Sequence, residues 1–210
     1  RLVRISRPYR LQTTEVTQRQ WEQVMGGNPS RFKGANRPVE WVSWNAAVAF
    51  CRKLSAMEEQ RYRLPTEAEW ERACRAGTTT RFSFGDSDAD LFRYGNYCDR
   101  SNTSDFDWQD LEHDDGFDKT APVGSFPANA WGLHDMHGNL WEWCADWRAK
   151  DYDPDETTDP VGPGQGTHHT LRGGAWCSRP SSCRSPNRGW GTPDGGRTMR
   201  GFRVALELPQ

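Results

Sequence analysis

The sequence is poor in aliphatic residues and has no long apolar run. Hydrophobic residues make up 34% of the 210 positions, although the chain carries 11 Trp, 9 Phe and 5 Tyr. Nothing approaches the roughly 18 apolar residues that a membrane-spanning helix needs, so we expect no membrane span in this chain. No signal sequence is present, and the chain begins at Arg1 rather than Met. We therefore expect a processed or trimmed product, and the compartment stays unassigned.

An excess of charge of one sign is also missing. The 27 basic and 29 acidic residues leave a net charge of −2, so no overall field attracts nucleic acid or an anionic membrane. Only four of the basic residues are lysine. The excess of arginine fits a GC-rich genome as well as a preference for bidentate ion pairs. We expect no nucleic-acid partner.

Closely spaced cysteine pairs are absent as well. The chain has no C-x-x-C motif, which argues against a structural zinc site. Neither His134 with His137 nor His168 with His169 forms a helical zinc signature, so we interpret these histidines as solvated or hydrogen-bonded. One or two disulfides remain open. The six cysteines are Cys51, Cys74, Cys98, Cys144, Cys177 and Cys183.

Three segments in the first third of the chain predict helices. Thr17–Gln20 is a capping box that opens a helix, and Gly26-Gly27 ends it. Apolar residues recur at helical spacing from Ser43 to about Gln60. Thr66–Glu69 is a second capping box, and its helix is expected to end near Gly77.

The remainder alternates short aromatic runs with loops. We expect small strands at residues 82–84, 121–126, 170–176 and 201–206, and a single α+β domain over residues 1–210. This length is sufficient for one domain with its own core. The polar segment 86–119 contains enough aromatic anchors to be ordered, and a cation at Asp114-Asp115 would hold it in place.

Residues 132–143 combine two carboxylates, two glycines and two tryptophans within twelve positions. Carboxylate oxygens and the free carbonyls of a glycine-bearing turn are ligands that calcium prefers. Trp141 and Trp143 flank Glu142 and would bury such a turn. From the residue types alone, two interpretations stay open: a calcium site, or a core turn in which Asp135 and Glu142 accept backbone hydrogen bonds.

Four motifs in this chain resemble those of the formylglycine-generating enzyme (sulfatase-modifying factor) family. They occur in the family's order and place the resemblance over about Pro8 to Ala205. The resemblance implies a C-type-lectin-like fold with few helices, small twisted sheets and long ordered loops. The family's usual opening strand would lie upstream of Arg1. The motifs are RLPTEAEWE (Arg63–Glu71), GNLWEW (Gly138–Trp143), RGGAW (Arg172–Trp176) and GFRV (Gly201–Val204).

The resemblance also implies two structural calcium sites. Both would consist of the oxygen ligands that calcium favours. One would use the side chains of Asp135 and Glu142 with the carbonyls of Gly138 and Leu140. The other would use the side chains of Asn96 and Asp115 with the carbonyls of Tyr97 and Phe117.

Catalytic members of the family oxidise a sulfatase cysteine to formylglycine and hold copper(I) with two cysteines four residues apart. Here Cys177 and Cys183 follow Gly173-Gly174, but five residues lie between them. Aligned through Arg184–Arg188, the chain is about three residues shorter where the catalytic pair should lie. Two thiolates on one soft ion must converge within about 4–5 Å, so a shortened loop argues against the enzyme. Cys183 is then a buried thiol or is bridged to Cys74.

Other branches of the family offer different functions. Ergothioneine-type sulfoxide synthases take their iron-binding histidines from an extra helical domain, which is absent from this sequence. Variable proteins of diversity-generating retroelements use the fold to display a hypermutated binding face. Residues 172–204 suit that branch because framework residues alternate there with clusters of small or polar ones. Trp190 and Met199 are not residues that adenine-directed mutation of an asparagine codon easily yields, so some positions must be unvaried.

We therefore expect a non-catalytic, calcium-stabilised domain of the retroelement variable-protein type, whose ligand is an unidentified protein or other macromolecule. The first alternative is a copper-dependent formylglycine-generating oxidase that uses Cys177 and Cys183. The second is an accessory domain of a bacterial kinase or peptidase. The predicted ligand-binding residues are Cys177, Ser178, Arg179, Ser181, Ser182, Gly189, Trp190, Gly191, Thr192, Gly195, Gly196, Thr198, Met199 and Arg200.

Overall fold

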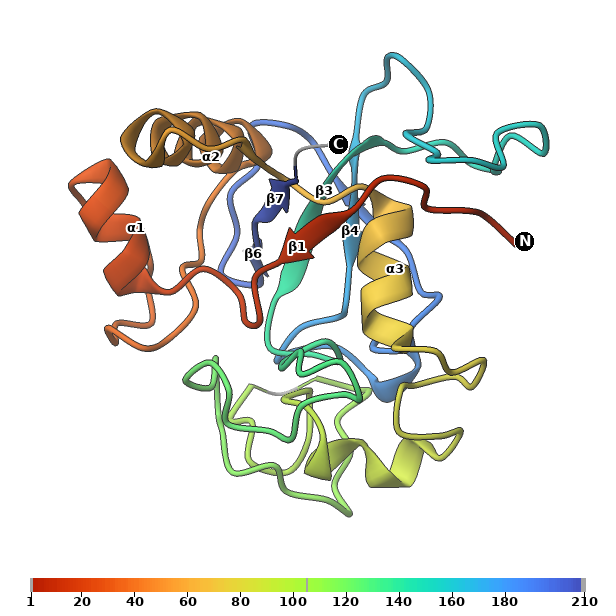
Figure 1. Cartoon of the computed structure of the whole chain (residues 1–210). Helices are drawn as coiled ribbons and strands as arrows, with labels where there is room; N and C mark the ends of the chain where they lie inside the picture. The colour runs from red at the N-terminus through yellow and green to blue at the C-terminus, as the bar shows by residue number, and fades with distance from the viewer. Residues whose placement is uncertain (1, 105, 209–210) are drawn as a thin grey trace.

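A computed structural model describes residues 2–104 and 106–208 of the chain (Figure 1). Its three α-helices are α1 (Gln18–Met25), α2 (Trp44–Glu58) and α3 (Glu67–Arg75). Helices α1 and α2 lie on one side of the central strands and α3 on the other. In the described part of residues 76–140, the only named element is the short 3-10 helix η1 (Asp88–Arg93). The α+β fold class is confirmed.

The helix boundaries follow the local signals in the sequence. Thr17 and Thr66 each accept a hydrogen bond from the third helical residue, and both capping boxes close. Ser43 caps α2 by accepting from the backbone of Ala46. Gly26 ends α1 with φ of 85°, a left-handed conformation that glycine adopts without steric cost. All three predicted helices are confirmed.

Two small sheets join distant parts of the chain. The first has the order β1-β7-β2 and is antiparallel, so it ties the two terminal segments together. The second has the order β5-β4-β3-β6, with β6 parallel to β3. A second 3-10 helix, η2, spans Pro180–Ser182. The strands are β1 (Tyr9–Leu11), β2 (Tyr62–Arg63), β3 (Trp141–Trp147), β4 (His169–Arg172), β5 (Gly189–Gly191), β6 (Arg200–Gly201) and β7 (Ala205–Glu207).

The strand predictions were only partly correct. Residues 170–176 and 201–206 contain parts of β4, β6 and β7, whereas residues 121–126 form no strand and Phe82 makes only an isolated bridge with Gly85. The longest strand, β3, was not predicted. Its register shifts between Trp143 and Trp147, and most of its residues are buried, so the sequence lacks the alternation of a half-exposed strand.

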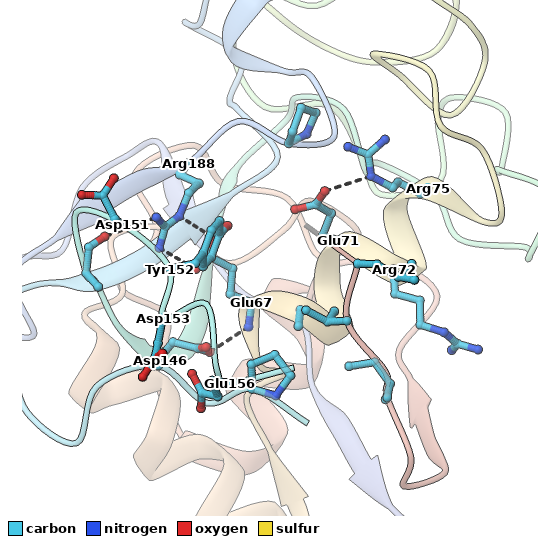
Figure 2. A pocket seen from close by; sticks show the side chains of 18 of the residues that line it. Glu67, Glu71, Arg72, Arg75, Asp146, Asp151, Tyr152, Asp153, Glu156 and Arg188 are labelled. Carbon is cyan, nitrogen blue, oxygen red and sulfur yellow. Dashed lines mark hydrogen bonds and ion pairs between the residues drawn. The ribbon is translucent and has the colours of Figure 1, made fainter. Parts of the chain in front are cut away.

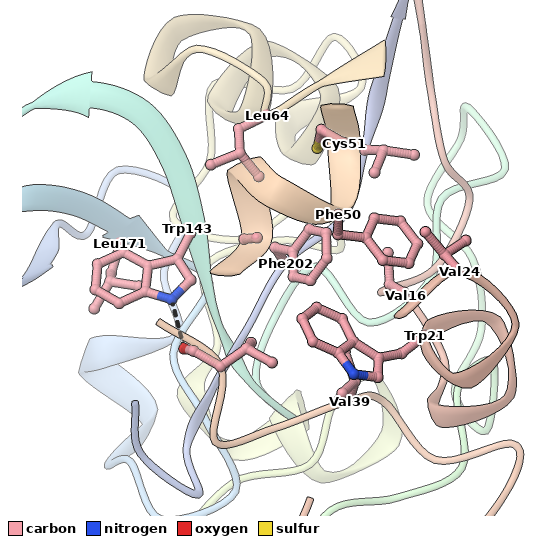
Figure 3. Close-up of a cluster of buried hydrophobic side chains, with 13 residues drawn as sticks. Val16, Trp21, Val24, Val39, Phe50, Cys51, Leu64, Trp143, Leu171 and Phe202 are labelled. Carbon is pink, nitrogen blue, oxygen red and sulfur yellow. Dashed lines mark hydrogen bonds between the residues drawn. The ribbon is translucent and has the colours of Figure 1, made fainter. Parts of the chain in front are cut away.

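The core between α1, α2 and the sheets is largely aromatic (Figure 3). Trp21 stacks on Phe50 with ring centroids 5.5 Å apart, and Phe202 meets both rings edge-on. The indole of Trp143 donates a hydrogen bond of 3.0 Å to the carbonyl of Val42. This core is therefore filled largely by a small number of large aromatic side chains, as the composition indicated.

In the described chain, no helix combines the length and the apolar character that crossing a membrane would require.

Candidate functional site

The two candidate copper ligands flank η2 but pack into different hydrophobic clusters. Cys183 is fully buried with Phe82, Leu91 and Tyr97. Cys177 is 7% exposed and packs with Leu140, Ala175 and Trp176. All six cysteines are free thiols, so no bridge joins Cys74 to Cys183. Cys183 was expected to be either a buried thiol or bridged to Cys74, and the structure shows the buried thiol.

Burial also suppresses ionisation of these thiols. It raises the pKa of Cys177 to about 12, and the neighbouring Cys98 adds to the shift. Burial, followed by the proximity of Cys177, raises the pKa of Cys183 as well. The Cys183 side chain packs directly on Gly174, where an added Cβ would lie 2.5 Å from its Sγ. Copper(I) is held by thiolates, so a metal bound here would have to displace the protons of both thiols.

The oxygen ligands predicted from Asn96 and Asp115 are brought together by the loops around η1. The Oδ1 atom of Asn96 is buried and has no hydrogen-bond partner within the described chain. The Asp115 carboxylate accepts hydrogen bonds from the backbone of Tyr97 (2.9 Å) and Phe117 (2.8 Å). Burial, followed by the nearby charge of Asp99, raises the pKa of Asp115 to about 7. An orphaned amide oxygen in the residue before Tyr97, together with a half-buried carboxylate bound to the Tyr97 backbone, is an oxygen donor set that fits calcium.

The predicted site at Asp135 and Glu142 has a different arrangement. Both Glu142 oxygens pair with the guanidinium of Arg203 at 2.7 Å, and the Trp70 indole donates a further hydrogen bond at 2.8 Å. Asp135 accepts from the backbone of Gly124 through Oδ2, while its Oδ1 has no partner among the described residues. A calcium ion here would share Glu142 with Arg203.

Glu15 belongs to this second cluster and was not predicted. It is fully buried, and neither carboxylate oxygen has a hydrogen-bond partner in residues 2–104 and 106–208. Burial, followed by the charges of Asp135 and Glu142, raises the pKa of Glu15 well above its usual value. The only sequence signal is its place just before the first capping box, which says nothing about burial.

No group of three or more His, Cys, Asp or Glu side chains is arranged to hold a metal in the part of the chain described. Calcium at either place therefore depends on amide and carbonyl oxygens in addition to carboxylates. The predicted carbonyl ligands are those of Tyr97 and Phe117 at one place and of Gly138 and Leu140 at the other.

The candidate ligand-binding residues of segment 172–204 divide between interior and surface. Cys177, Ser178 and Gly191 are buried, so they cannot touch a ligand without rearrangement. Arg179, Trp190 and Thr192 are exposed. The remaining ones are half-buried: Ser181, Ser182, Gly189, Gly195, Gly196, Thr198, Met199 and Arg200.

Exposed tryptophans border this segment. Trp190 lies on β5 and is 54% exposed, with the guanidinium of Arg148 over its ring at 4.6 Å. The indole of Trp108 donates to the carbonyl of Cys177 at 3.1 Å, and Arg179 lies 5.4 Å above its ring. The backbone of Trp41 donates to the carbonyl of Arg197. Sequence reasoning missed Trp41 and Trp108, because only the tertiary structure brings them to the C-terminal segment.

The geometry can be set beside known proteins. The sulfatase-modifying factor enzyme 1-like domain family matches residues 1–208. Formylglycine-generating enzymes from Mus musculus and Thermomonospora curvata are 36% and 38% identical to this chain; each alignment covers 89% of it, and 49% and 61% of the respective relative. The chain thus spans about half to three-fifths of these relatives' lengths.

A solved structure extends the comparison to the fold. Treponema denticola variable protein 1 superposes with a TM-score of 0.83 and 32% identity, over 95% of this chain and 84% of its own. The fold is accordingly the C-type-lectin-like fold of formylglycine-generating enzymes and of retroelement variable proteins. The match over residues 1–208 means that this chain belongs to the sulfatase-modifying factor enzyme 1-like domain family.

Proposed function

We propose that this chain is a non-catalytic ligand-binding domain. The observation that carries the proposal is the burial of Cys177 and Cys183 in separate hydrophobic clusters. Copper(I) would need both sulfurs ionised, and burial opposes ionisation of each thiol. Both thiols are shielded from solvent by the side chains of their clusters.

Binding is assigned to the exposed part of segment 172–204 and the tryptophans beside it. Trp and Arg are enriched among residues that dominate protein interfaces, and Trp108, Arg179 and Trp190 are exposed together with Trp41. The ligand is an unidentified protein or other macromolecule. The likeness to variable protein 1 supports a retroelement variable protein in particular.

The variable-protein assignment has a genomic test. A reverse transcriptase gene and a near-copy of the Arg172–Val204 coding segment, rich in adenines, should lie near the gene for this protein. Failure to find such a template would remove the variable-protein assignment and leave the binding domain standing.

Calcium is proposed as a structural cofactor. The loops between η1 and β3 have few regular hydrogen bonds, and Asn96 and Asp115 offer oxygens to a cation there. An ion bound at this place would hold the loops together where no backbone hydrogen-bond ladder of a sheet does so. The cluster of Asp135, Glu142 and Glu15 is the weaker candidate for calcium. Its Glu142 carboxylate is already neutralised by Arg203.

A peptide-oxidation assay tests the absence of catalysis. A sulfatase-derived cysteine peptide, supplied with copper, oxygen and a thiol reductant, should yield no formylglycine with the wild type. The first alternative, an oxidase like the formylglycine-generating enzymes compared above, predicts turnover that disappears in Cys183→Ser. Cys51→Ser is the matched control, since Cys51 is an equally buried thiol far along the sequence, in α2. Turnover that survives in Cys51→Ser and is lost in Cys183→Ser would contradict the proposal.

A further inference from the structure

A pocket of about 1150 Å³ opens beside α3 (Figure 2). Its walls come from the N-terminal residues, from α3 and from the loop after β3. Only Pro186 and Arg188 of segment 172–204 reach it. Nothing in the proposed function uses this pocket.

The charged lining is mainly acidic. Six carboxylates face three guanidinium groups, a formal surplus of three negative charges. Arg188 binds Glu67 through two hydrogen bonds of 2.6 and 2.8 Å, and Arg75 binds Glu71 at 2.9 Å. Arg172, behind the wall, also contacts Glu71 and reduces the surplus to two. Among the described residues, no arginine pairs with the carboxylates of Asp146, Asp151, Asp153 or Glu156.

Asp146 is the buried member of this acidic set. It is 6% exposed, and its Oδ2 accepts a hydrogen bond of 2.7 Å from the backbone of Glu67. Its Oδ1 lies near Gly162 and accepts no hydrogen bond from another residue in the described chain. Burial raises the pKa of Asp146 to about 7. A buried carboxylate without a positively charged partner at the wall of a pocket favours a positively charged occupant.

Apolar and aromatic side chains complete the lining. The ring of Tyr152 already carries the guanidinium of Arg188 at 4.2 Å, and the ring of Trp131 carries that of Arg72 at 4.9 Å. These rings are already paired with arginine, so they contribute apolar contact surface to the pocket wall. An aliphatic stem would find contact surface on Leu2, Val3, Ile5, Pro160 and Pro163.

We propose that this pocket binds an organic cation, a guanidinium or ammonium group carried on an aliphatic stem. The same chemistry is present in a free diamine and in the arginine or lysine side chain of a peptide. The acidic loop after β3 would attract the charged group, and the apolar residues of the N-terminal segment would contact the stem.

Calorimetric titration with agmatine, in 50 mM salt at pH 8, tests the proposal. The control is Asp155→Asn, because Asp155 is an exposed carboxylate on the same loop that does not line the pocket. Agmatine should bind the wild type and this control with equal affinity. The double variant Asp151→Asn/Asp153→Asn should bind roughly threefold or more weakly, since each exposed charge pair contributes modestly. Uncharged 1,4-butanediol should not bind.

A second titration distinguishes the two sources of the cation. It uses a short blocked peptide with one arginine and the same peptide with citrulline in its place. Binding of agmatine alone assigns the pocket to free amines, and binding of the arginine peptide but not the citrulline peptide assigns it to a side chain. Absence of saturable binding by both cations, or equal affinities of the double variant and the Asp155→Asn control, would overturn the proposal.

Discussion

Arg203→Gln is expected to lower the free energy of unfolding by about 3–5 kcal/mol, the cost of breaking a buried ion pair from one side. Arg203 is fully buried and pairs with both oxygens of Glu142. It also donates to the backbone carbonyl of His134. Without the guanidinium, the buried carboxyls of Glu15, Asp135 and Glu142 would lose their nearest compensating charge. Urea denaturation followed by tryptophan fluorescence measures the loss.

Arg61→Gln is the matched control for this prediction. Arg61 pairs with Glu207 at 3.1 Å, but its side chain is 84% exposed. An exposed pair contributes at most about 1 kcal/mol, so this variant should unfold close to the wild type. Equal losses in the two variants would show that the buried cluster does not depend on Arg203.

Removal of calcium is the second change with a large expected effect. At a calcium concentration 100 times its Kd, binding adds about 2.7 kcal/mol to the stability of the folded state. For a chain of this size, that corresponds to a Tm about 5–10 °C higher with calcium than with chelator. Asp115→Asn should remove most of this difference, because Asp115 is the only carboxylate among the predicted ligands of its site. Differential scanning calorimetry at pH 8 measures it.

The calcium effect should grow between pH 6 and pH 8. The pKa of Asp115 is raised to about 7 in the fold, so the metal-free folded state holds this proton more tightly than the unfolded chain does. Stability of the metal-free protein is therefore lost as pH rises from the unfolded pKa towards 7. A bound calcium ion offsets the charge of the Asp115 carboxylate only when that carboxylate is ionised. The stabilisation by calcium therefore increases as the pH rises through about 7. The lowered pKa of His137, about 4, acts in the opposite direction but is present with and without calcium, so it cancels in the difference.

Glu112→Gln provides the control for the calcium series. Glu112 lies in the same loop, its side chain is exposed, and it is not among the predicted calcium ligands. This variant should retain the full calcium-dependent rise in Tm and its pH dependence. A wild-type Tm that does not respond to calcium at pH 8 would contradict the structural role proposed for the ion.

The features that were predictable from the sequence are encoded locally or by motif. Thr17, Ser43 and Thr66 mark helix starts because a capping side chain acts on a backbone group only a few residues away. The four motifs occur in the same order as in the family, and they predicted the family over nearly the whole chain. Tyr97 and Asp115, both assigned through the resemblance, are joined by a hydrogen bond across 18 positions of the chain.

The features that were not predictable depend on contacts between distant segments. Strand β3 is defined by pairing with β4 and β6, which follow it by more than twenty residues, and its buried faces hide any alternation. The pair of Arg203 with Glu142 spans 61 positions, and no local pattern marks Glu15 as its buried neighbour. The exposure of Trp41 and Trp108 is likewise decided by tertiary packing.

The central claim is that Cys177 and Cys183 do not form a copper centre. Its most direct test is a copper(I) titration of the reduced protein against a chromophoric chelator of known affinity. The expected result is no stoichiometric transfer of copper from the chelator, with the same curve for the wild type, Cys177→Ser and Cys183→Ser. Transfer of one equivalent to the wild type that is lost in both variants, and kept in Cys51→Ser, would contradict the claim.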